Sequence, residues 1–111
     1  MSIDFDAFLA VDIRVGQITG AAANPKALKP AYILIIDFGS ELGTRTSSAQ
    51  LTVHYTPESL VGRRVIAVVN FEPKRIAGVK SEVLVLGVPD EAGAVVLLVP
   101  DLDVPLGGRM Y

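Results

Sequence analysis

The sequence predicts an all-β fold: a five-stranded barrel in a single domain over residues 1–111. Three observations predict it. The length gives room for one hydrophobic core and no more. Short apolar runs of strand length recur along the chain, with glycine or proline between most of them. A short helix signal separates the third run from the fourth, and a second one precedes the first run.

The N-terminal residues favour a helical turn over Asp4–Leu9, capped by Ser2 or Asp4. Its apolar residues lie at helical spacing on one side: Phe5, Phe8 and Leu9. A strand pattern then starts at Asp12, with Ile13 and Val15 on one face. After Gly16 the apolar position shifts to Ile18, so we expect a bulge or bend at this glycine.

The second strand, Tyr32–Phe38, is apolar on both faces and is expected at the centre of the sheet. A loop marked by Asn24, Pro25 and Pro30 precedes it, and the turn Gly39–Gly43 follows it. In the third strand alternate residues form a polar face: Thr44, Thr46, Ser48, Gln50 and Thr52. The residues between them that are expected to face the core are Ala49, Leu51 and Val53.

A short helix is predicted after Thr56, which is typical of a helix N-cap and is followed by a first-turn proline, Pro57, and a first-turn acid, Glu58. The helix is expected to run to Leu60, and Gly62 ends it. Further strands are predicted at Arg64–Phe71, Glu82–Val88 and Ala94–Val99. Five strands with a helix between the third and fourth are the arrangement of the OB-fold, which binds oligonucleotides on its strand 2 and 3 face and on nearby loops. Another small barrel remains an alternative from the pattern alone.

Composition excludes several functions. The chain has no cysteine, which rules out disulfides, thiol catalysis and cysteine metal sites. No apolar run approaches the roughly 18 residues of a membrane span, and the N-terminus lacks a basic targeting region, so no membrane insertion and a cytoplasmic location are expected. Half of the residues are apolar and the mean hydropathy is +0.47, which favours burial of surface between subunits over a monomer.

The sequence gives little support for an enzyme. His54 is the only histidine, and no local motif supplies carboxylate partners for it, so a surface strand histidine is the better interpretation. The spacing of Gly39, Gly43 and Thr44 is one residue short of a phosphate loop, and Arg45 stands where no phosphate-loop lysine would be. The flanking segments are also strand to strand and not strand to helix. We therefore expect no catalysis, no cofactor and no metal.

The net charge of −2 conceals a basic centre. Residues 1–13 carry −3 and residues 81–111 carry −4, whereas residues 14–80 hold nine basic and four acidic side chains. The densest basic cluster lies in a loop shaped by Pro73 and Gly78. Exposed cations are commonly just solvated. Nearby aromatic and amide groups, however, match what single-stranded RNA requires. The residues concerned are Arg45, Asn70, Phe71, Lys74, Arg75 and Lys80, beside the polar face of the third strand.

Several segments resemble one known family. They are DIRVGQI from Asp12, IDFGSELG from Ile36, SSAQ from Ser47, YTPESLVGRRV from Tyr55, VVNFEPKRIAG from Val68 and KSEVLVLG from Lys80. They look like the export-related chaperone CsaA, within the tRNA-binding OB-fold domains also appended to methionyl- and phenylalanyl-tRNA synthetases and to an endothelial monocyte-activating cytokine. Val83 and Leu84 follow the CsaA pattern, where tRNA-binding relatives place Gly and Met. Glu72 departs from CsaA relatives, which often have proline there, and should lower phosphate affinity.

The resemblance implies an OB-fold homodimer whose first and last segments form the interface, which suits Phe5, Phe8 and Leu9. It also implies ligand contacts at Ser48, Gln50, Asn70, Lys74, Arg75 and Ser81. Two functions follow as hypotheses: a tRNA-binding module, and a chaperone that holds unfolded or preprotein segments and acts with export machinery. An alternative is a stand-alone tRNA-binding module that assists an aminoacyl-tRNA synthetase without chaperone activity.

Overall fold

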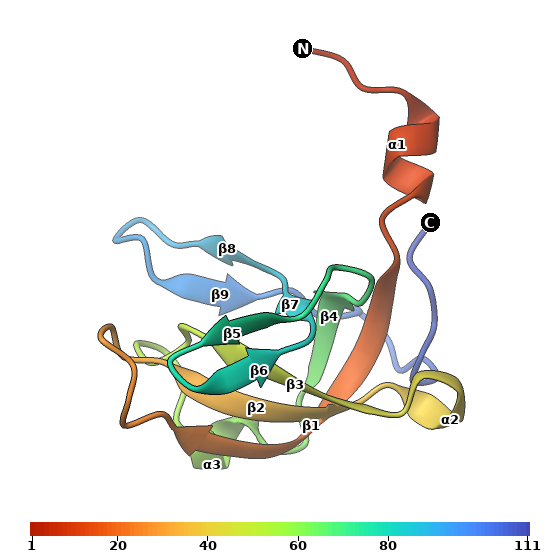
Figure 1. Cartoon of the computed structure of the whole chain (residues 1–111). Helices are drawn as coiled ribbons and strands as arrows, with labels where there is room; N and C mark the ends of the chain where they lie inside the picture. Colours follow the sequence, from red (N-terminus) through yellow and green to blue (C-terminus); the bar gives the residue numbers. More distant parts are fainter.

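The computed structural model describes residues 1–111, and its main sheet curves into a nearly closed barrel (Figure 1). Strand β1 (Ile13–Ala23) pairs antiparallel with β2 (Tyr32–Asp37) on one side and with β4 (Arg64–Val68) on the other. At the edges β3 (Thr44–Ala49) joins β2, and β7 (Leu84–Val85) joins β4. The five-stranded order β3-β2-β1-β4-β7 confirms the predicted OB-fold.

Two hairpins extend from the barrel. The first joins β5 (Lys74–Ile76) to β6 (Val79–Ser81), and the second joins β8 (Gly87–Pro89) to β9 (Val95–Leu97). The basic segment predicted as a loop is therefore a β-hairpin. Its two turn residues, Ala77 and Gly78, both have positive φ, 48° and 81°, as a two-residue turn that matches the twist of its strands requires.

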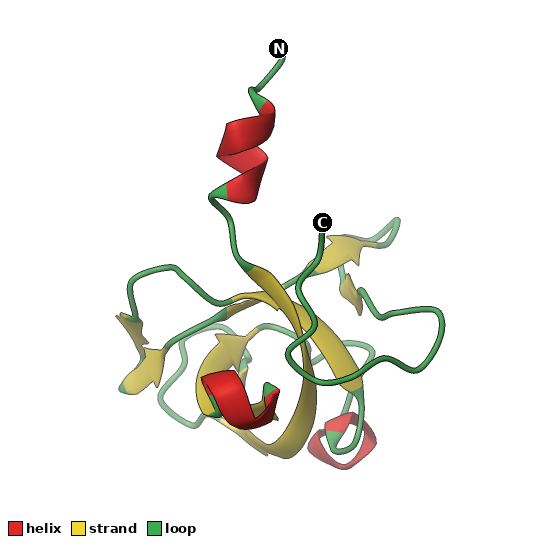
Figure 2. Cartoon of the chain, turned by 90° about the vertical axis from the view of Figure 1, so that its right-hand side faces the viewer, coloured by secondary structure: helices red, strands yellow, loops and turns green.

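Three short helices accompany the strands. In α3 (Pro57–Leu60) the side chains of Thr56 and Ser59 cap each other's backbone N–H groups, which confirms the predicted helix. The predicted turn after β2 contains one helical turn, α2 (Gly39–Leu42). At the N-terminus α1 (Phe5–Leu9) stands away from the barrel (Figure 2) and buries none of its residues. None of these helices has the length and apolar character to cross a membrane.

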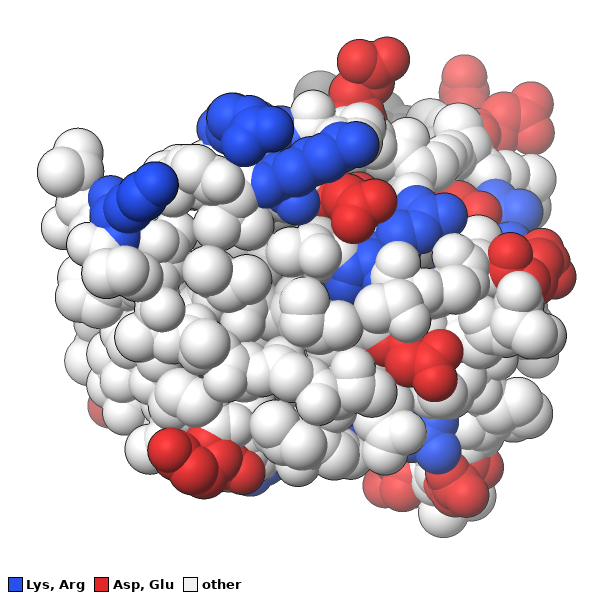
Figure 3. Space-filling model, turned by 60° about the horizontal axis from the view of Figure 1, so that its bottom comes forward, with Lys and Arg blue, Asp and Glu red and all other residues white.

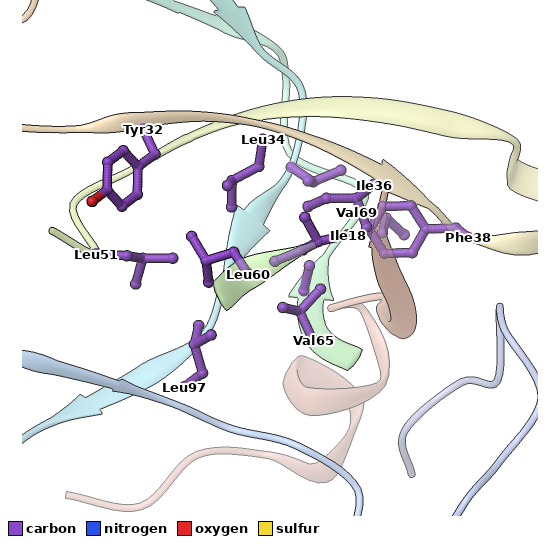
Figure 4. Packing of buried hydrophobic residues seen from close by; sticks show 12 residues of the cluster. Ile18, Tyr32, Leu34, Ile36, Phe38, Leu51, Leu60, Val65, Val69 and Leu97 are labelled. Atoms are coloured by element: carbon purple, nitrogen blue, oxygen red, sulfur yellow. The ribbon is translucent and has the colours of Figure 1, made fainter. Parts of the chain in front are cut away.

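The core fills the interior of the barrel and consists of a cluster of twelve buried residues (Figure 4). Ile18 of β1, Leu34 of β2 and Val65 of β4 have no exposed surface. Leu60 of α3 is also fully buried, so this helix closes one end of the barrel with an apolar side chain. Leu51 faces this core as expected, with 3 % of its surface exposed.

The third strand is shorter than predicted. It ends at Ala49, and residues 52–54 form a turn that leads the chain to the Thr56 cap. Val53, expected in the core, is therefore 74 % exposed. His54 is a turn residue and not a strand residue, and its Nε2 lies 2.6 Å from the Asp90 carboxylate.

The later strands also end differently from the prediction. The fourth strand stops at Val68, so Phe71 lies outside it and is 56 % exposed. The predicted fifth strand divides at Leu86, whose N–H donates to the Ile66 carbonyl oxygen. It divides there because the chain changes its pairing partner at Leu86, whose carbonyl oxygen accepts from the Leu98 N–H at 3.2 Å: β7 pairs with β4, and β8 pairs with β9.

Gly16 does not mark a bulge. The register shift against β2 lies between Ile18 and Gly20. Gly16 is instead a point of close packing, because a Cβ added there would lie 2.6 Å from Ile36 Cγ2 and 2.8 Å from the Phe38 ring. Both side chains are buried, so neither can move aside easily.

We expect the Gly16→Ala substitution to destabilise the protein by about 1–3 kcal/mol, because it overpacks the core. The melting temperature should fall by roughly 4–8 °C for each kcal/mol in a domain of this size. Thermal unfolding measures it. Gly20→Ala is the matched control on the same strand, since its Cβ would meet only the partly exposed Ile35, at 3.3 Å. Equal melting temperatures for the two variants would contradict the packing role.

Candidate nucleic-acid interface

Hydrogen bonds from β3 to the last residue of β6 and to the residue after it place the β5–β6 hairpin beside the polar face of β3. The Ser48 N–H donates to Ser81 Oγ at 3.0 Å. The Glu82 N–H donates to the Thr46 carbonyl oxygen at 2.8 Å, and the Glu82 carboxylate accepts from the Thr46 N–H at 3.1 Å. These contacts link the two edges of the barrel, so the hairpin stands over the face on which OB-folds bind oligonucleotides.

The two faces of the hairpin carry different groups. Lys74 and Ile76 share one face, because alternate residues of a strand point the same way, and Lys74 lies opposite Ser81 in the ladder. This inner face is turned toward β3, since Ser81 bonds to Ser48. Arg75 and Lys80 are paired on the outer face and are exposed. The cations of the predicted cluster therefore point in two directions.

A groove of about 560 Å³, the lysine groove, lies between β3, the hairpin tip and the loop after β1. Ser48 and Gln50 provide its polar groups from the β3 side. Lys26 and Lys29 contribute two cations from the loop. The remaining lining is apolar: Ala27, Leu28, Ala31, Ile76 and Ala77. The groove can therefore bind a phosphate group beside a flat apolar group.

A second hollow of about 310 Å³, the hairpin cleft, lies against the same inner face of the hairpin, toward its base. Phe71 lines it, as do Leu84 and Val83, and Leu84 is 50 % exposed. Two carboxylates, those of Glu72 and Glu82, also line this cleft. The other lining residues are Lys74, Ile76 and Ser81. Its character is more apolar and less basic than that of the lysine groove.

Four predicted site residues lie outside both hollows: Arg75 and Lys80 on the outer face of the hairpin, and Arg45 and Asn70 elsewhere. Arg45 lies on the inward-facing side of β3, whereas Ser48 lies on the opposite side. The Arg45 Nε donates to the Leu42 carbonyl oxygen, in α2, at 3.2 Å. Asn70 has both side-chain amide groups engaged by the N-terminal segment: it donates to the Ala10 carbonyl oxygen at 2.8 Å and accepts from the Asp12 N–H at 2.9 Å. Asn70 thus fixes the start of β1 to the end of β4.

Charged contacts near the chain ends continue this anchoring. A hydrogen bond from the Arg14 guanidinium lowers the pKa of Asp12 and raises the pKa of Arg14 in turn. Arg109 donates to the Leu9 carbonyl oxygen at 2.7 Å, which joins the C-terminal segment to α1. On the far hairpin, a hydrogen bond to His54 lowers the pKa of Asp90. These groups hold segments together, and none of them lies in either hollow.

Lys26 and Lys29 were missed in the sequence, because they are isolated cations in a proline-bounded loop, more than forty residues from the basic cluster. The OB-fold prediction could have identified these two lysines, since the loop between the first two strands borders the oligonucleotide-binding face.

Figure 3 turns the underside of the barrel toward the reader and shows Lys and Arg side chains gathered toward one edge, with acidic side chains among them.

An OB barrel that gathers lysines, an amide and hydroxyl groups around β3 has the architecture of an oligonucleotide-binding domain. Residues 13–109 match the family model described as "Putative tRNA binding domain", and the chain belongs to this family.

Two solved structures resemble the whole chain. The chaperone CsaA of Bacillus anthracis is 50 % identical, with a TM-score of 0.90 and full coverage of both chains. The CsaA chaperone protein of Picrophilus torridus is 45 % identical, with a TM-score of 0.92, over 99 % of this chain and all of the other. The methionine–tRNA ligase of Pyrococcus abyssi is 39 % identical over 110 residues, which are 99 % of this chain and 15 % of the ligase. The chain therefore spans only a small part of the curated relatives that it matches.

Proposed function

We propose that this protein binds tRNA without catalysing a reaction, in the cytoplasm, and that the lysine groove and the adjoining hairpin are its RNA-binding surface. The convergence of Lys26 and Lys29 around Ser48 and Gln50 carries this proposal, and Lys74 lies beside them, opposite the Ser81 whose hydroxyl accepts from the Ser48 N–H. Lysines neutralise phosphates, while amide and hydroxyl groups bind sugar and base edges. Family membership supports the proposal independently.

The surface suits an extended polyanion more than a small anion. Past Lys29 and Gln50 the lysine groove adjoins a further hollow of about 340 Å³ under the turn of the β8–β9 hairpin. On the outer face of the β5–β6 hairpin, Arg75 and Lys80 provide two further cations. The only aromatic group beside these hollows is Phe71, so base stacking contributes less than contacts to the backbone.

Replacing Lys74 and Arg75 by alanine should weaken tRNA binding and reduce its salt dependence, because fewer counterions are released from the RNA. The slope of log K against log salt concentration should fall by about one unit for each lost phosphate contact. A mobility-shift titration at several salt concentrations measures it. Arg63→Ala is the control for a cation outside both hollows, since Arg63 lies over the Tyr55 ring and bonds to Ser59. It is compared with the single variants Lys74→Ala and Arg75→Ala, because each of the three removes one positive charge. Absent or salt-independent binding by the wild type would refute tRNA binding.

A chaperone function is the second proposal, and the hairpin cleft favours it. Phe71 and Leu84 expose half or more of their surface there, in a position where an extended apolar segment could bind. Two structures that resemble the whole chain are described as CsaA chaperones. Under this proposal unfolded or preprotein segments are the clients, and export machinery is the associated partner.

Leu84→Gln should reduce suppression of client aggregation while leaving tRNA affinity unchanged, because it makes the cleft polar and adds no charge. Light scattering of a denatured client at stoichiometric protein ratios measures the first property, and the tRNA titration measures the second. Val88→Gln, an equally exposed residue on β8, controls for the loss of surface apolar area. If the wild type suppresses no aggregation, the alternative remains: a tRNA-binding module that assists an aminoacyl-tRNA synthetase, detectable by co-purification.

We also propose that the protein is a homodimer joined through α1. The Phe5 and Phe8 rings lie together, with centroids 6.0 Å apart, yet Phe5 is 71 % exposed and Leu9 is 45 % exposed. An apolar helix that stands in solvent away from its own barrel (Figure 2) gains most by packing against a second copy. The Arg109 contact to Leu9 brings the C-terminal segment to the same end of the molecule.

The double substitution Phe5→Ser and Phe8→Ser should convert a dimer of about twice 11.8 kDa into a monomer, because it removes the apolar face of α1. Sedimentation equilibrium measures the mass. The control is Val53→Ser, at an exposed apolar residue in the turn before α3. A wild type that sediments as a monomer would exclude the dimer.

A further inference from the structure

The buried side chain of Asn24 connects the two walls of the lysine groove. Asn24 follows β1 and is only 8 % exposed. Its Nδ2 donates to the carbonyl oxygen of Ala77, at the hairpin tip, at 3.3 Å. Its Oδ1 accepts from the Lys26 N–H, in the loop, at 3.0 Å. The orientation of the amide is fixed, because the Lys26 N–H can only donate and the Ala77 oxygen can only accept.

The backbone of Asn24 is engaged as well. Its N–H donates to the Ala31 carbonyl oxygen at 3.0 Å, and its carbonyl oxygen accepts from the Ala27 N–H at 3.2 Å. The loop is therefore closed on itself at Asn24, and the same residue reaches across to the hairpin. A buried side-chain amide whose nitrogen and oxygen each make a hydrogen bond in this way holds both partners in place.

Lys26 is positioned by this arrangement. A Cβ added to Gly78, next to Ala77, would lie 3.4 Å from Lys26 Cδ and 3.7 Å from its Nζ, so the lysine side chain extends over the hairpin tip. No ion pair holds the Lys26 ammonium. Its place above the groove therefore depends on the loop and the hairpin tip staying together, and their direct side-chain link is the Asn24 amide.

We propose that Asn24 is a positioning residue for RNA binding: it ties the loop of residues 24–31 to the hairpin tip and so fixes Lys26 as a phosphate-binding group of the lysine groove. This inference rests on the proposed tRNA binding. Asn24 acts through Lys26 and the hairpin, and its own buried side chain need not contact the RNA.

Two neutral substitutions separate the link to the hairpin from the stability of the loop. Asn24→Leu removes both side-chain hydrogen bonds and keeps the same number and branching of side-chain heavy atoms. Asn24→Ser keeps a short oxygen that can accept from the Lys26 N–H, but it cannot reach Ala77. We expect both variants to bind tRNA several-fold more weakly, with a salt slope lower by about one unit, the share of one phosphate contact. Asn24→Ser also keeps the test usable if Asn24→Leu fails to fold.

Tyr32→Phe is the stability control. It removes a comparable bond, from the Tyr32 hydroxyl to the Tyr55 carbonyl oxygen at 2.8 Å, at a residue that lines neither hollow. This variant should melt at a lower temperature and bind tRNA as the wild type does. Melting temperature and tRNA affinity are measured on the same samples. A fall in tRNA affinity caused by unfolding is therefore distinguished from one caused by displacement of Lys26.

A double-mutant cycle supplies the decisive readout. If Asn24 acts through Lys26, the effects of Asn24→Leu and Lys26→Ala on tRNA affinity should be strongly non-additive, whereas Asn24→Leu and Lys74→Ala should add, since Lys74 lies at the base of the hairpin. Additive effects with Lys26→Ala, or Asn24 variants that bind with wild-type affinity and slope, would overturn the inference and leave tRNA binding intact. A wild type that binds no tRNA would instead refute the proposed function itself.

Discussion

A small set of side-chain hydrogen bonds closes the barrel where β3 meets residues 81–83, and both hollows depend on that closure. Strands β3 and β7 are the two edges of the sheet and share no ladder. The hydroxyl of Ser81 and the carboxylate of Glu82 serve backbone N–H groups of β3 instead. Ser47, 1 % exposed, donates from its hydroxyl to the Val83 carbonyl oxygen at 3.0 Å and so satisfies a polar group inside the core. Without these bonds the edge of β3 would be open and the hairpin unsupported.

The closure also explains how a chain with a net charge of −2 presents a basic surface. Arg75 and Lys80 face each other across the hairpin, an arrangement of like charges that costs stability in a sheet. Glu82 lies two residues after Lys80 in the sequence, but its carboxylate accepts from the Thr46 N–H where β3 meets residues 81–83. No carboxylate therefore offsets the repulsion between Arg75 and Lys80, and the proposed polyanionic ligand would offset it on binding. The stability that this pair costs in the folded protein would then be recovered as affinity for the ligand.

Structural features that depend on residues close together in the chain could be predicted from the sequence. The capped helix at Thr56 is an example, because its signal lies within four residues. The sequence was insufficient where partners are far apart. Asn70 looks like a base reader in isolation, yet its amide binds Ala10, sixty residues away. The β5–β6 hairpin was predicted as a loop because Ala77 is an uncommon residue at positive φ, and a single glycine does not define a two-residue turn.

The two hollows share a wall, which bears on how RNA and polypeptide would act on one molecule. Ile76 lines both the lysine groove and the hairpin cleft, on a hairpin held to the barrel at its base through Ser81 and at its tip through Asn24. A ligand in either hollow that shifts the hairpin would change the width of the other hollow. Thermodynamic linkage makes such an effect reciprocal. If bound RNA changes the affinity for peptide by some factor, bound peptide changes the affinity for RNA by the same factor. Any coupling between the two proposed ligands would therefore act through the position of this hairpin, whose Ile76 lines both hollows.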